Sequence, residues 1–332
     1  MTPTTLLSGR QRRRAWLALA ASLLAAPLAV AQAAYPQRAV TLVAPYPAGG
    51  ASDVLARLLA RKLEEQLGKP VVVDNRPGAG TTIGATHVAN ARPDGYTLFL
   101  SSNSTFSLNP AAGVKTSYDP ATSFDAIGLV GTMPLAVVVH PSVPAQNVQQ
   151  LVAAVRANPD KYPYGSFGNA TSSHYAGAMF NQAAGLNMLH VPYKGSAPLM
   201  NDLIGGQVPV SFDSVVVAAP QREAGKVRVL AVTTAQRSHN LADVPTVAES
   251  GYPGFDFSVW MAVVGPKGLP AEVRQRLTQA LQAVMQASDT QASMRKAGFE
   301  PQWQSVADWA KLVRDDIARM KTVAEQARIR IE

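Results

Sequence analysis

The hydrophobic pattern of residues 39–67 changes once, from a strand-like run to a helical period. The β-branched run that begins at Val40 is bounded by prolines, which is typical of a buried strand. Apolar residues then recur at helical spacing as far as Gly68, a natural C-cap. We therefore predict a strand, a loop and a helix whose N-cap is Ser52 or Asp53. The loop and the first helical turn contain Ala48, Gly49, Gly50, Ser52 and Asp53.

This loop and the start of the helix behind it form a predicted anion-binding site, which we call an anion seat. A helix N-terminus presents backbone N–H groups without intrahelical partners and the positive end of the helix dipole. Glycines ahead of the helix let an anion approach it. No Gly-Lys-Ser/Thr sequence follows them, and the Gly-x-Gly-x-x-Gly spacing is missing. The pattern therefore favours neither a P-loop nor a dinucleotide site, and on its own it is equally consistent with a structural turn.

A second loop of the same kind follows in a separate α/β region. A short strand at Tyr164 leads into small and hydroxyl-bearing residues, and a helix is predicted from His174 to Ala184, before Gly185. Two such helix starts indicate two anion seats that face each other across a cleft between lobes. The second seat contains Ser166, Gly168, Asn169, Thr171, Ser172 and Ser173.

Strand and helix patterns alternate along most of the chain, which predicts an α/β fold with a parallel, helix-covered sheet. Ligands of such sheets bind beyond the carboxyl ends of the strands. Ser101 and Asn103 follow one predicted strand there, and Asp213 follows another. The remaining predictions are separate apolar strands over 126–130 and 135–139 and tail helices over 271–287, 290–297 and 306–329.

The composition is that of a globular, exported chain. Its 332 residues are 47% hydrophobic and 16% charged, enough for two domains, and the absence of cysteine excludes disulfides and thiolate chemistry. Residues 1–33 hold four arginines, an uncharged run and an Ala-x-Ala sequence, which predicts a cleavable signal peptide and a periplasmic location. Without those four arginines the formal net charge falls from +8 to +4. No basic run interleaved with aromatic residues remains, so we expect no nucleic-acid partner.

Catalytic signals are sparse. The five histidines form no zinc-binding pair, and no Gly-x-Ser-x-Gly sequence occurs. Ser172 and Ser173 precede His174, but a catalytic triad needs a spatial arrangement that adjacency in sequence does not provide. We therefore expect a binding protein that is not an enzyme and needs no metal or cofactor.

Several motifs together resemble the Bug family, the extracytoplasmic solute-binding proteins of tripartite tricarboxylate transporters. They are residues 45–53 (Pro-Tyr-Pro-Ala-Gly-Gly-Ala-Ser-Asp), 74–80 (Asp-Asn-Arg-Pro-Gly-Ala-Gly), 93–98 (Pro-Asp-Gly-Tyr-Thr-Leu), 165–177 and 190–195 (His-Val-Pro-Tyr-Lys-Gly). The chain departs from the family pattern at Thr81, where a further glycine is usual, and at Ser214, where asparagine is more common. These departures bear on ligand preference rather than on fold.

The resemblance implies a type II periplasmic-binding-protein fold, in which two α/β lobes close on a ligand. Lobe 1 would comprise residues 34–134 and 260–332, and lobe 2 residues 135–259. The ligand would be a small carboxylate: a di- or tricarboxylate, an acidic amino acid or an aromatic acid. Both predicted seats would hold it, and Ser101, Asn103, Tyr193, Lys194 and Asp213 would line the cleft.

The partners implied are the membrane subunits of the transporter, and we expect a monomer. Two alternatives stay open at this point. The closed protein could dock a signalling partner, or the chain could be a periplasmic hydrolase that uses Ser172 or Ser173.

Overall fold

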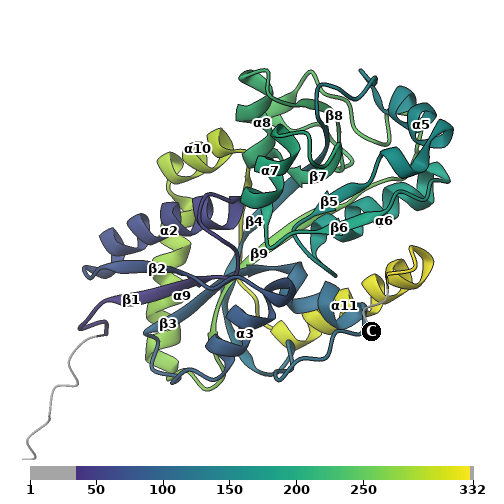
Figure 1. Ribbon diagram of the computed structural model, residues 1–332. Coiled ribbons are helices and arrows are strands. Elements are labelled where there is room, and N and C mark those ends of the chain that lie inside the picture. The colour runs from purple at the N-terminus through teal and green to yellow at the C-terminus, as the bar shows by residue number, and fades with distance from the viewer. Residues whose placement is uncertain (1–34, 330–332) are drawn as a thin grey trace, which may run out of the picture. The chain divides into compact units, whose positions relative to one another are not determined.

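The computed structural model describes residues 35–329, and residues 36 onward belong to one structural unit (Figure 1). The predicted signal peptide therefore lies outside the described residues. No helix among residues 35–329 is long and apolar enough to cross a membrane.

Strands and helices alternate through the described chain. The strands are β1 Val40–Ala44, β2 Val71–Asn75, β3 Thr97–Ser102, β4 Phe124–Val139, β5 Tyr164–Ser166, β6 His190–Pro192, β7 Val210–Ser214, β8 Arg228–Val232, β9 Ser258–Pro266 and β10 Glu300–Gln304. The helices are α2 Ala51–Leu67, α3 Thr82–Ala89, α4 Asn109–Ala111, α5 Val148–Ala157, α6 Ser172–Ala184, α7 Ser196–Ile204, α8 Val215–Glu223, α9 Ala271–Gln286, α10 Ser288–Ala297 and α11 Trp309–Gln326. Short helical turns span Ala79–Thr81, Ser104–Leu108, Pro159–Lys161 and His239–Leu241.

The strands form one sheet with the order β2-β1-β3-β9-β4-β7-β5-β6, and β10 and β8 also pair with β4. Strand β1 is parallel to β2 and β3, and β5 is parallel to β6 and β7. The long strands β4 and β9 are antiparallel to their neighbours. The sheet is therefore mixed, and the prediction of a parallel sheet holds only for its two outer parts.

Strand β4 changes partners along its length. Residues Phe124 to Pro134 pair with β9, whereas Leu135 to Val139 pair with β7 and β8. The strands thus fall into two groups that share β4, and each group carries its own helices (Figure 1). These are the two α/β lobes of the predicted fold class.

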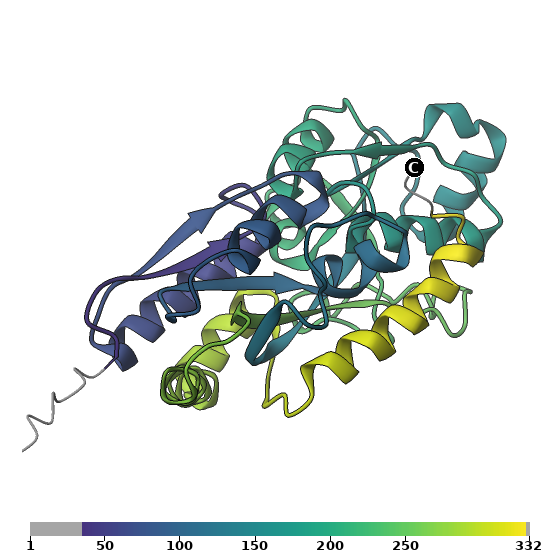
Figure 2. The ribbon, with the colours of Figure 1, turned by 90° about the horizontal axis from the view of Figure 1, so that it is seen from below.

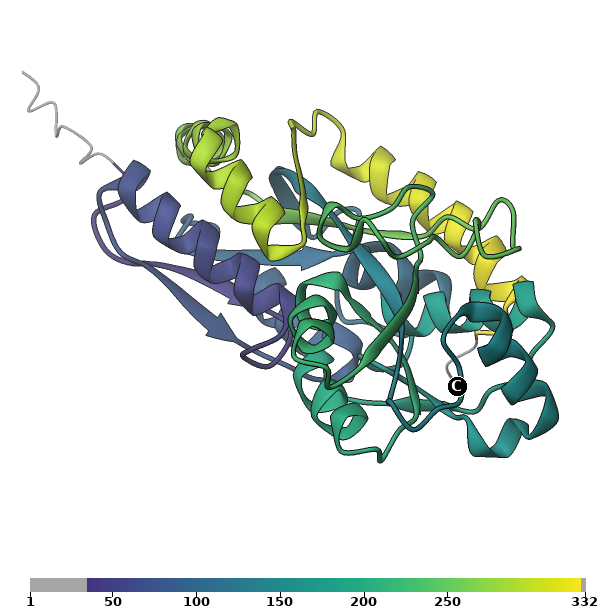
Figure 3. The same ribbon diagram turned by 90° about the horizontal axis from the view of Figure 1, so that it is seen from above.

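Helix α2 illustrates how sequence sets the local structure. Leu55, Leu59 and Leu63 recur at helical spacing and are buried, and Gly68 closes the helix in a left-handed conformation at φ 69°. The helix lies beside α9, where the Arg276 guanidinium donates to the Gln66 carbonyl oxygen (Figure 3). This contact brings the C-terminal segment onto the first lobe.

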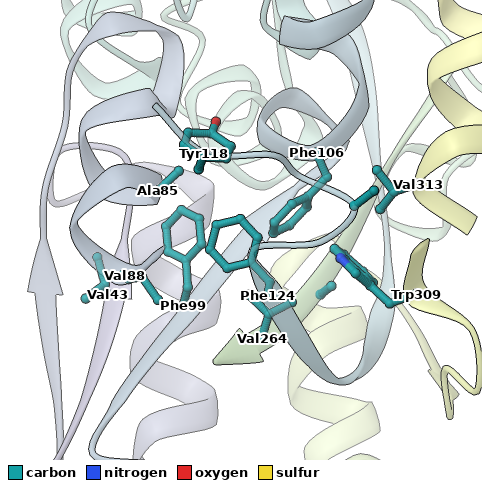
Figure 4. Packing of buried hydrophobic residues seen from close by; sticks show 12 residues of the cluster. Val43, Ala85, Val88, Phe99, Phe106, Tyr118, Phe124, Val264, Trp309 and Val313 are labelled. Carbon is teal, nitrogen blue, oxygen red and sulfur yellow. The ribbon is translucent and has the colours of Figure 1, made fainter. Parts of the chain in front are cut away.

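An aromatic cluster forms the core of the first lobe (Figure 4). The Phe106 ring is fully buried and contacts four others: its centroid lies 6.1 Å from Phe99, 5.6 Å from Phe124, 5.9 Å from Trp260 and 4.8 Å from Trp309. The cluster joins a helical turn, β9 and α11. Figure 2 shows α11 running on from this lobe, and it also contacts α6 of the second lobe.

Four predicted elements were wrong in detail. The strands expected over 126–130 and 135–139 are one continuous strand, β4, because pairing with β9 and then β7 keeps the backbone extended. Residues 300–304 form β10 on the edge of β4 rather than a linker between helices. Helix α11 begins at Trp309 with Asp308 as its N-cap. The N-cap of α2 is Gly50, so Ser52 and Asp53 lie in the first helical turn.

Candidate functional site

Three helices begin at one small cavity between the lobes. The cavity is lined by the first residues of α2, α6 and α7, which are Ala51, Ser172 and Ser196. Its volume is about 30 Å³. One water molecule occupies about 10–15 Å³ of such volume, so the cavity is small. The full lining is Tyr46, Gly50, Ala51, Ser52, Ser101, Ser102, Met133, Phe167, Ser172, Ser196, Val259 and Met261. We call it the inner cavity.

The N-termini of these helices are left open toward the inner cavity. Their N-cap residues are Gly50, Thr171 and Gly195, and none donates or accepts a side-chain capping hydrogen bond. The first N–H groups of a helix have no intrahelical partner, so the positive dipole ends and backbone donors of three helices surround the space. On α6 the Ser172 N–H already donates to Ser104 Oγ. No charged side chain lines it, and five serine hydroxyls do. The inner cavity is therefore suited to an anionic group of small size.

Buried polar atoms without partners gather around this place. Most buried polar groups in proteins are hydrogen-bonded, so each exception calls for an explanation. Among the described side chains, the atoms without a partner include Ser52 Oγ, Asn103 Oδ1, Asn109 Oδ1, Ser211 Oγ and Asp213 Oδ2. Ser52 follows β1, Asn103 follows β3 and Asp213 lies near the end of β7, and ligands of α/β folds bind beyond such strand ends.

The two lobes touch at the site. The Ser172 backbone N–H of the second lobe donates to Ser104 Oγ of the first lobe at 3.0 Å. Gly80 of the first lobe lies so close to the second that a Cβ there would be 2.7 Å from the Asn169 carbonyl oxygen. The structure therefore has the lobes in direct contact around the inner cavity.

An outer cavity of about 400 Å³ adjoins the inner one. Tyr46 and Phe167 line both cavities, and their rings meet edge to face with centroids 6.1 Å apart. The outer cavity also has two exposed lysines, Lys115 from the first lobe and Lys194 from the second, and no acidic side chain lines it. An anionic group would therefore meet a positive environment there.

The predicted site residues divide into three groups. Those that line the inner cavity are Gly50, Ser52, Ser101 and Ser172. Those that line the outer cavity are Gly168, Asn169, Tyr193 and Lys194. Those that line neither are Ala48, Gly49, Asp53, Asn103, Ser166, Thr171, Ser173 and Asp213.

Several residues of the third group fix the loops that carry the others. Asp53 Oδ2 accepts from the Gly49 backbone N–H at 3.0 Å and from Arg57 at 2.9 Å. Burial opposes the charge of Asp53, but these hydrogen bonds outweigh it and hold its pKa below the usual value. Thr171 Oγ1 donates to the Gly168 carbonyl oxygen at 2.7 Å, and Ser173 Oγ donates to that of Phe212.

A pair of stacked imidazoles supports the second-lobe loop. The rings of His174 and His190 are parallel, with centroids 3.8 Å apart. His174 Nδ1 accepts from the Ala170 backbone N–H at 3.1 Å, and His190 Nε2 lies 2.6 Å from Ser166 Oγ. Burial lowers the pKa of His174 to about 4; burial and then His174 lower that of His190 to about 3. Both rings are neutral at pH 7 and serve as supports for the loop.

Most of the apolar lining and the start of α7 were not predicted as parts of the site. Ser196 has the same glycine-then-serine pattern before a helix as the other two seats, so that signal was present in the sequence. Tyr46 and Phe167 lie inside the predicted loops. The apolar residues Met133, Val259 and Met261 come from β4 and β9, and only the register of these strands brings them to the site.

Among the described residues, no group of three or more histidine, aspartate or glutamate side chains is placed to hold a metal ion. The donors of the inner cavity are hydroxyls and backbone N–H groups, which suit an anion rather than a cation.

Comparisons with known proteins agree with this geometry. Residues 55–329 match the model of the tripartite tricarboxylate transporter family receptor. A structure of Rpa4515 from R. palustris with adipate is 36% identical, with a TM-score of 0.86 over 90% of this chain and 99% of that one. The periplasmic binding protein BugD is 38% identical, with a TM-score of 0.85 over 90% and 100%. MatC from Rhodopseudomonas palustris, with bound malate, is 29% identical, with a TM-score of 0.81 over 87% and 99%.

Proposed function

Because the chain belongs to the tripartite tricarboxylate transporter family of receptors, we propose that it is a periplasmic protein that captures a small carboxylate between its lobes. The family match confirms the resemblance to Bug-type solute-binding proteins. One observation carries the proposal: three uncapped helix N-termini and five serine hydroxyls converge on a cavity that no charged side chain lines.

A carboxylate fits these donors better than other anions do. It accepts several hydrogen bonds from N–H and O–H groups and needs no buried cation as counter-charge. The inner cavity has room for one carboxylate group but not for a whole dicarboxylate. We infer that the carboxylate enters the inner cavity and that the rest of the ligand extends past Tyr46 and Phe167, which line both cavities, into the outer cavity.

The ligand class is a di- or tricarboxylate, an acidic amino acid or an aromatic acid. Rpa4515 with adipate and MatC with malate support a dicarboxylate. Lys115 and Lys194 at the outer cavity would favour a second negative group on the ligand.

The proposed mechanism is closure of the lobes on the ligand. Lobe 1 comprises residues 34–134 and 260–332, and lobe 2 residues 135–259. The change of partners in β4 supports the boundary between residues 134 and 135, because Pro134 is the last residue that pairs with β9 and Leu135 is the first that pairs with β7. A ligand that touches both lobes favours the closed state by its greater affinity for that state.

The closed protein would then act as a monomer that delivers its ligand to the membrane subunits of a transporter. Docking of a sensor protein by the same closed form is the alternative, and a neighbouring gene for a sensor kinase would favour it. Export through a cleavable signal peptide at residues 1–33 stays a prediction.

The geometry argues against a hydrolase. Ser173 Oγ donates to a backbone carbonyl oxygen, and His174 Nδ1 is occupied by the Ala170 backbone N–H. Among residues 35–329 no histidine or carboxylate is hydrogen-bonded to the Ser172 hydroxyl. His174, with its pKa lowered to about 4 by burial, is a weak proton acceptor. We propose that the protein has no enzymatic activity.

A thermal-shift panel tests the proposal. Acetate, benzoate, glutamate, malate, adipate and citrate are each added at pH 7, with the amides of the same acids as matched controls. One or a few of the acids should raise the unfolding temperature by about 5 °C or more at a thousandfold excess over Kd, since binding then adds about 4 kcal/mol of stability. The amides should give no shift, because they lack the negative charge that the helix N-termini bind.

Failure of every acid in the panel would overturn the proposal. Turnover of an ester or amide substrate that is lost in a Ser172→Ala or Ser173→Ala variant would support the hydrolase instead.

A further inference from the structure

Ser196 links the inner cavity to a carboxyl group that does not reach it. The side chain lines the cavity at the first turn of α7, and its Oγ lies 2.6 Å from Asp213 Oδ1, to which it donates. A hydroxyl has one hydrogen to donate. While that hydrogen points at Asp213, Ser196 presents only lone pairs to the cavity.

Asp213 differs from the other buried carboxylates of the described chain. It is fully buried at the end of β7, and Oδ1 also accepts from the Ser214 backbone N–H at 2.7 Å, while Oδ2 has no partner. Asp53 is paired with Arg57 and Asp125 with Lys267, both at 2.9 Å. Among residues 35–329 no cationic side chain pairs with Asp213, so its negative charge is held by hydroxyl and N–H groups alone.

The charged and titratable groups of the surrounding elements are engaged elsewhere. On α7 Asp202 bonds Tyr193, on α8 Arg222 pairs with Asp243, and on β8 Arg228 donates to carbonyl oxygens of Val143 and Ala145. The other charged or titratable groups on the elements around Asp213 and on the facing lobe are Tyr46, Asp53, Asp125, Tyr164, His174, Tyr175, His190 and Glu223. None of these groups adds a charge interaction to Asp213, whose pKa burial raises to about 7.

We propose that Asp213 takes up a proton when a carboxylate binds, and that Ser196 transmits the event by reversing its hydrogen bond. In the bound state the Asp213 carboxyl O–H donates to Ser196 Oγ, and the Ser196 O–H donates to the ligand carboxylate. The proton comes from solvent, and no other covalent bond changes. Asp213 is thus a positioning residue that acts through Ser196, and this inference rests on the proposed function.

The ligand carboxylate and ionised Asp213 compete for the one hydroxyl hydrogen of Ser196. A bound anion disfavours ionised Asp213, so its pKa is higher in the complex than in the free protein. Binding therefore takes up a fraction of a proton that grows as the pH rises above the pKa of Asp213 in the free protein. Affinity is constant below that pKa and weakens as the pH rises above it, until the pH reaches the pKa of the complex.

Isothermal titration calorimetry measures this uptake directly. The acid that gives the largest shift in the thermal panel is titrated into the full mature protein at pH 8, in HEPES and in Tris. Because these buffers release protons with different enthalpies, the difference in binding heat gives the number of protons taken up. The ligand is fully ionised at pH 8, so the proton comes to rest on the protein.

Three variants locate the proton. In Asp213→Asn the side chain cannot take up a proton, so binding should show no uptake and no dependence on pH between 6 and 9. Ser196→Ala should also lose the uptake and bind more weakly. Asp125→Asn removes a buried carboxylate of the other lobe and should keep the uptake of the unmodified protein.

The outcomes separate the two proposals. Equal binding heats in both buffers, with binding intact, would overturn the proton uptake and leave the carboxylate receptor standing. Uptake that persists in Asp213→Asn would place the proton elsewhere, and uptake that persists in Ser196→Ala would overturn the transmission. If no acid of the panel binds, the proposed function fails and this inference with it.

Discussion

A Gly80→Ala variant is expected to bind its carboxylate at least about tenfold more weakly, equivalent to about 1.4 kcal/mol. A Cβ at this position would lie 2.7 Å from the Asn169 carbonyl oxygen of the second lobe and 3.2 Å from Asn109 Oδ1. Backbone atoms cannot rotate away from such a contact, so the lobes must stay apart. The ligand then loses the contacts that depend on both lobes, as titration calorimetry would measure.

Gly185→Ala is the matched control for this variant. Gly185 has φ +61°, against +60° for Gly80, and no atom would lie within 4 Å of its Cβ. Both substitutions carry the cost of a left-handed alanine, but only Gly80→Ala meets the opposite lobe. Affinities that are equal in the two variants would contradict contact between the lobes in the bound state.

The largest expected loss of stability is that of Phe106→Ala, about 3–5 kcal/mol in the free energy of unfolding. The Phe106 ring is fully buried and contacts Trp309 of α11 and two phenylalanines (Figure 4). It also contacts Trp260 of β9. Its removal leaves a cavity among rings that hold three segments together, and those rings cannot all move in to fill it. Urea denaturation followed by tryptophan fluorescence would measure the change.

Phe106→Leu serves as the comparison, because leucine keeps most of the buried volume. It should cost clearly less than the alanine variant. A loss below about 1 kcal/mol in Phe106→Ala would mean that the cluster contributes little to the stability of the first lobe.

The strand–helix units could be predicted because their signals are local. The apolar run at Val40, the leucine spacing of α2 and the C-cap at Gly68 each depend on neighbours in sequence. The α/β class with two lobes is therefore confirmed. The continuous β4 was missed because pairing with β9 and β7, far away in sequence, keeps its backbone extended. The edge strand β10 was missed because its backbone is fixed by pairing with β4, which is also distant in sequence.

The site was partly predictable for the same reason. Gly50, Ser52 and Ser172 belong to glycine- and serine-rich helix starts, and Ser196 shows a shorter version of that pattern. By contrast, which face of β9 carries Val259 and Met261 into the cavity depends on strand register and burial. The link between Ser196 and Asp213 is a single hydrogen bond of 2.6 Å, which no sequence pattern predicts.

The central claim is that one carboxylate is held by both lobes, and a crystal structure of the protein grown with saturating adipate tests it most directly. We expect one carboxylate in the inner cavity, within hydrogen-bond distance of donors at the starts of α2 and α6. Adipate bound to one lobe alone would show that the two lobes do not share the ligand. So would adipate bound instead in the larger groove of about 690 Å³ beside α11, where Gln302, Lys311 and Arg319 lie.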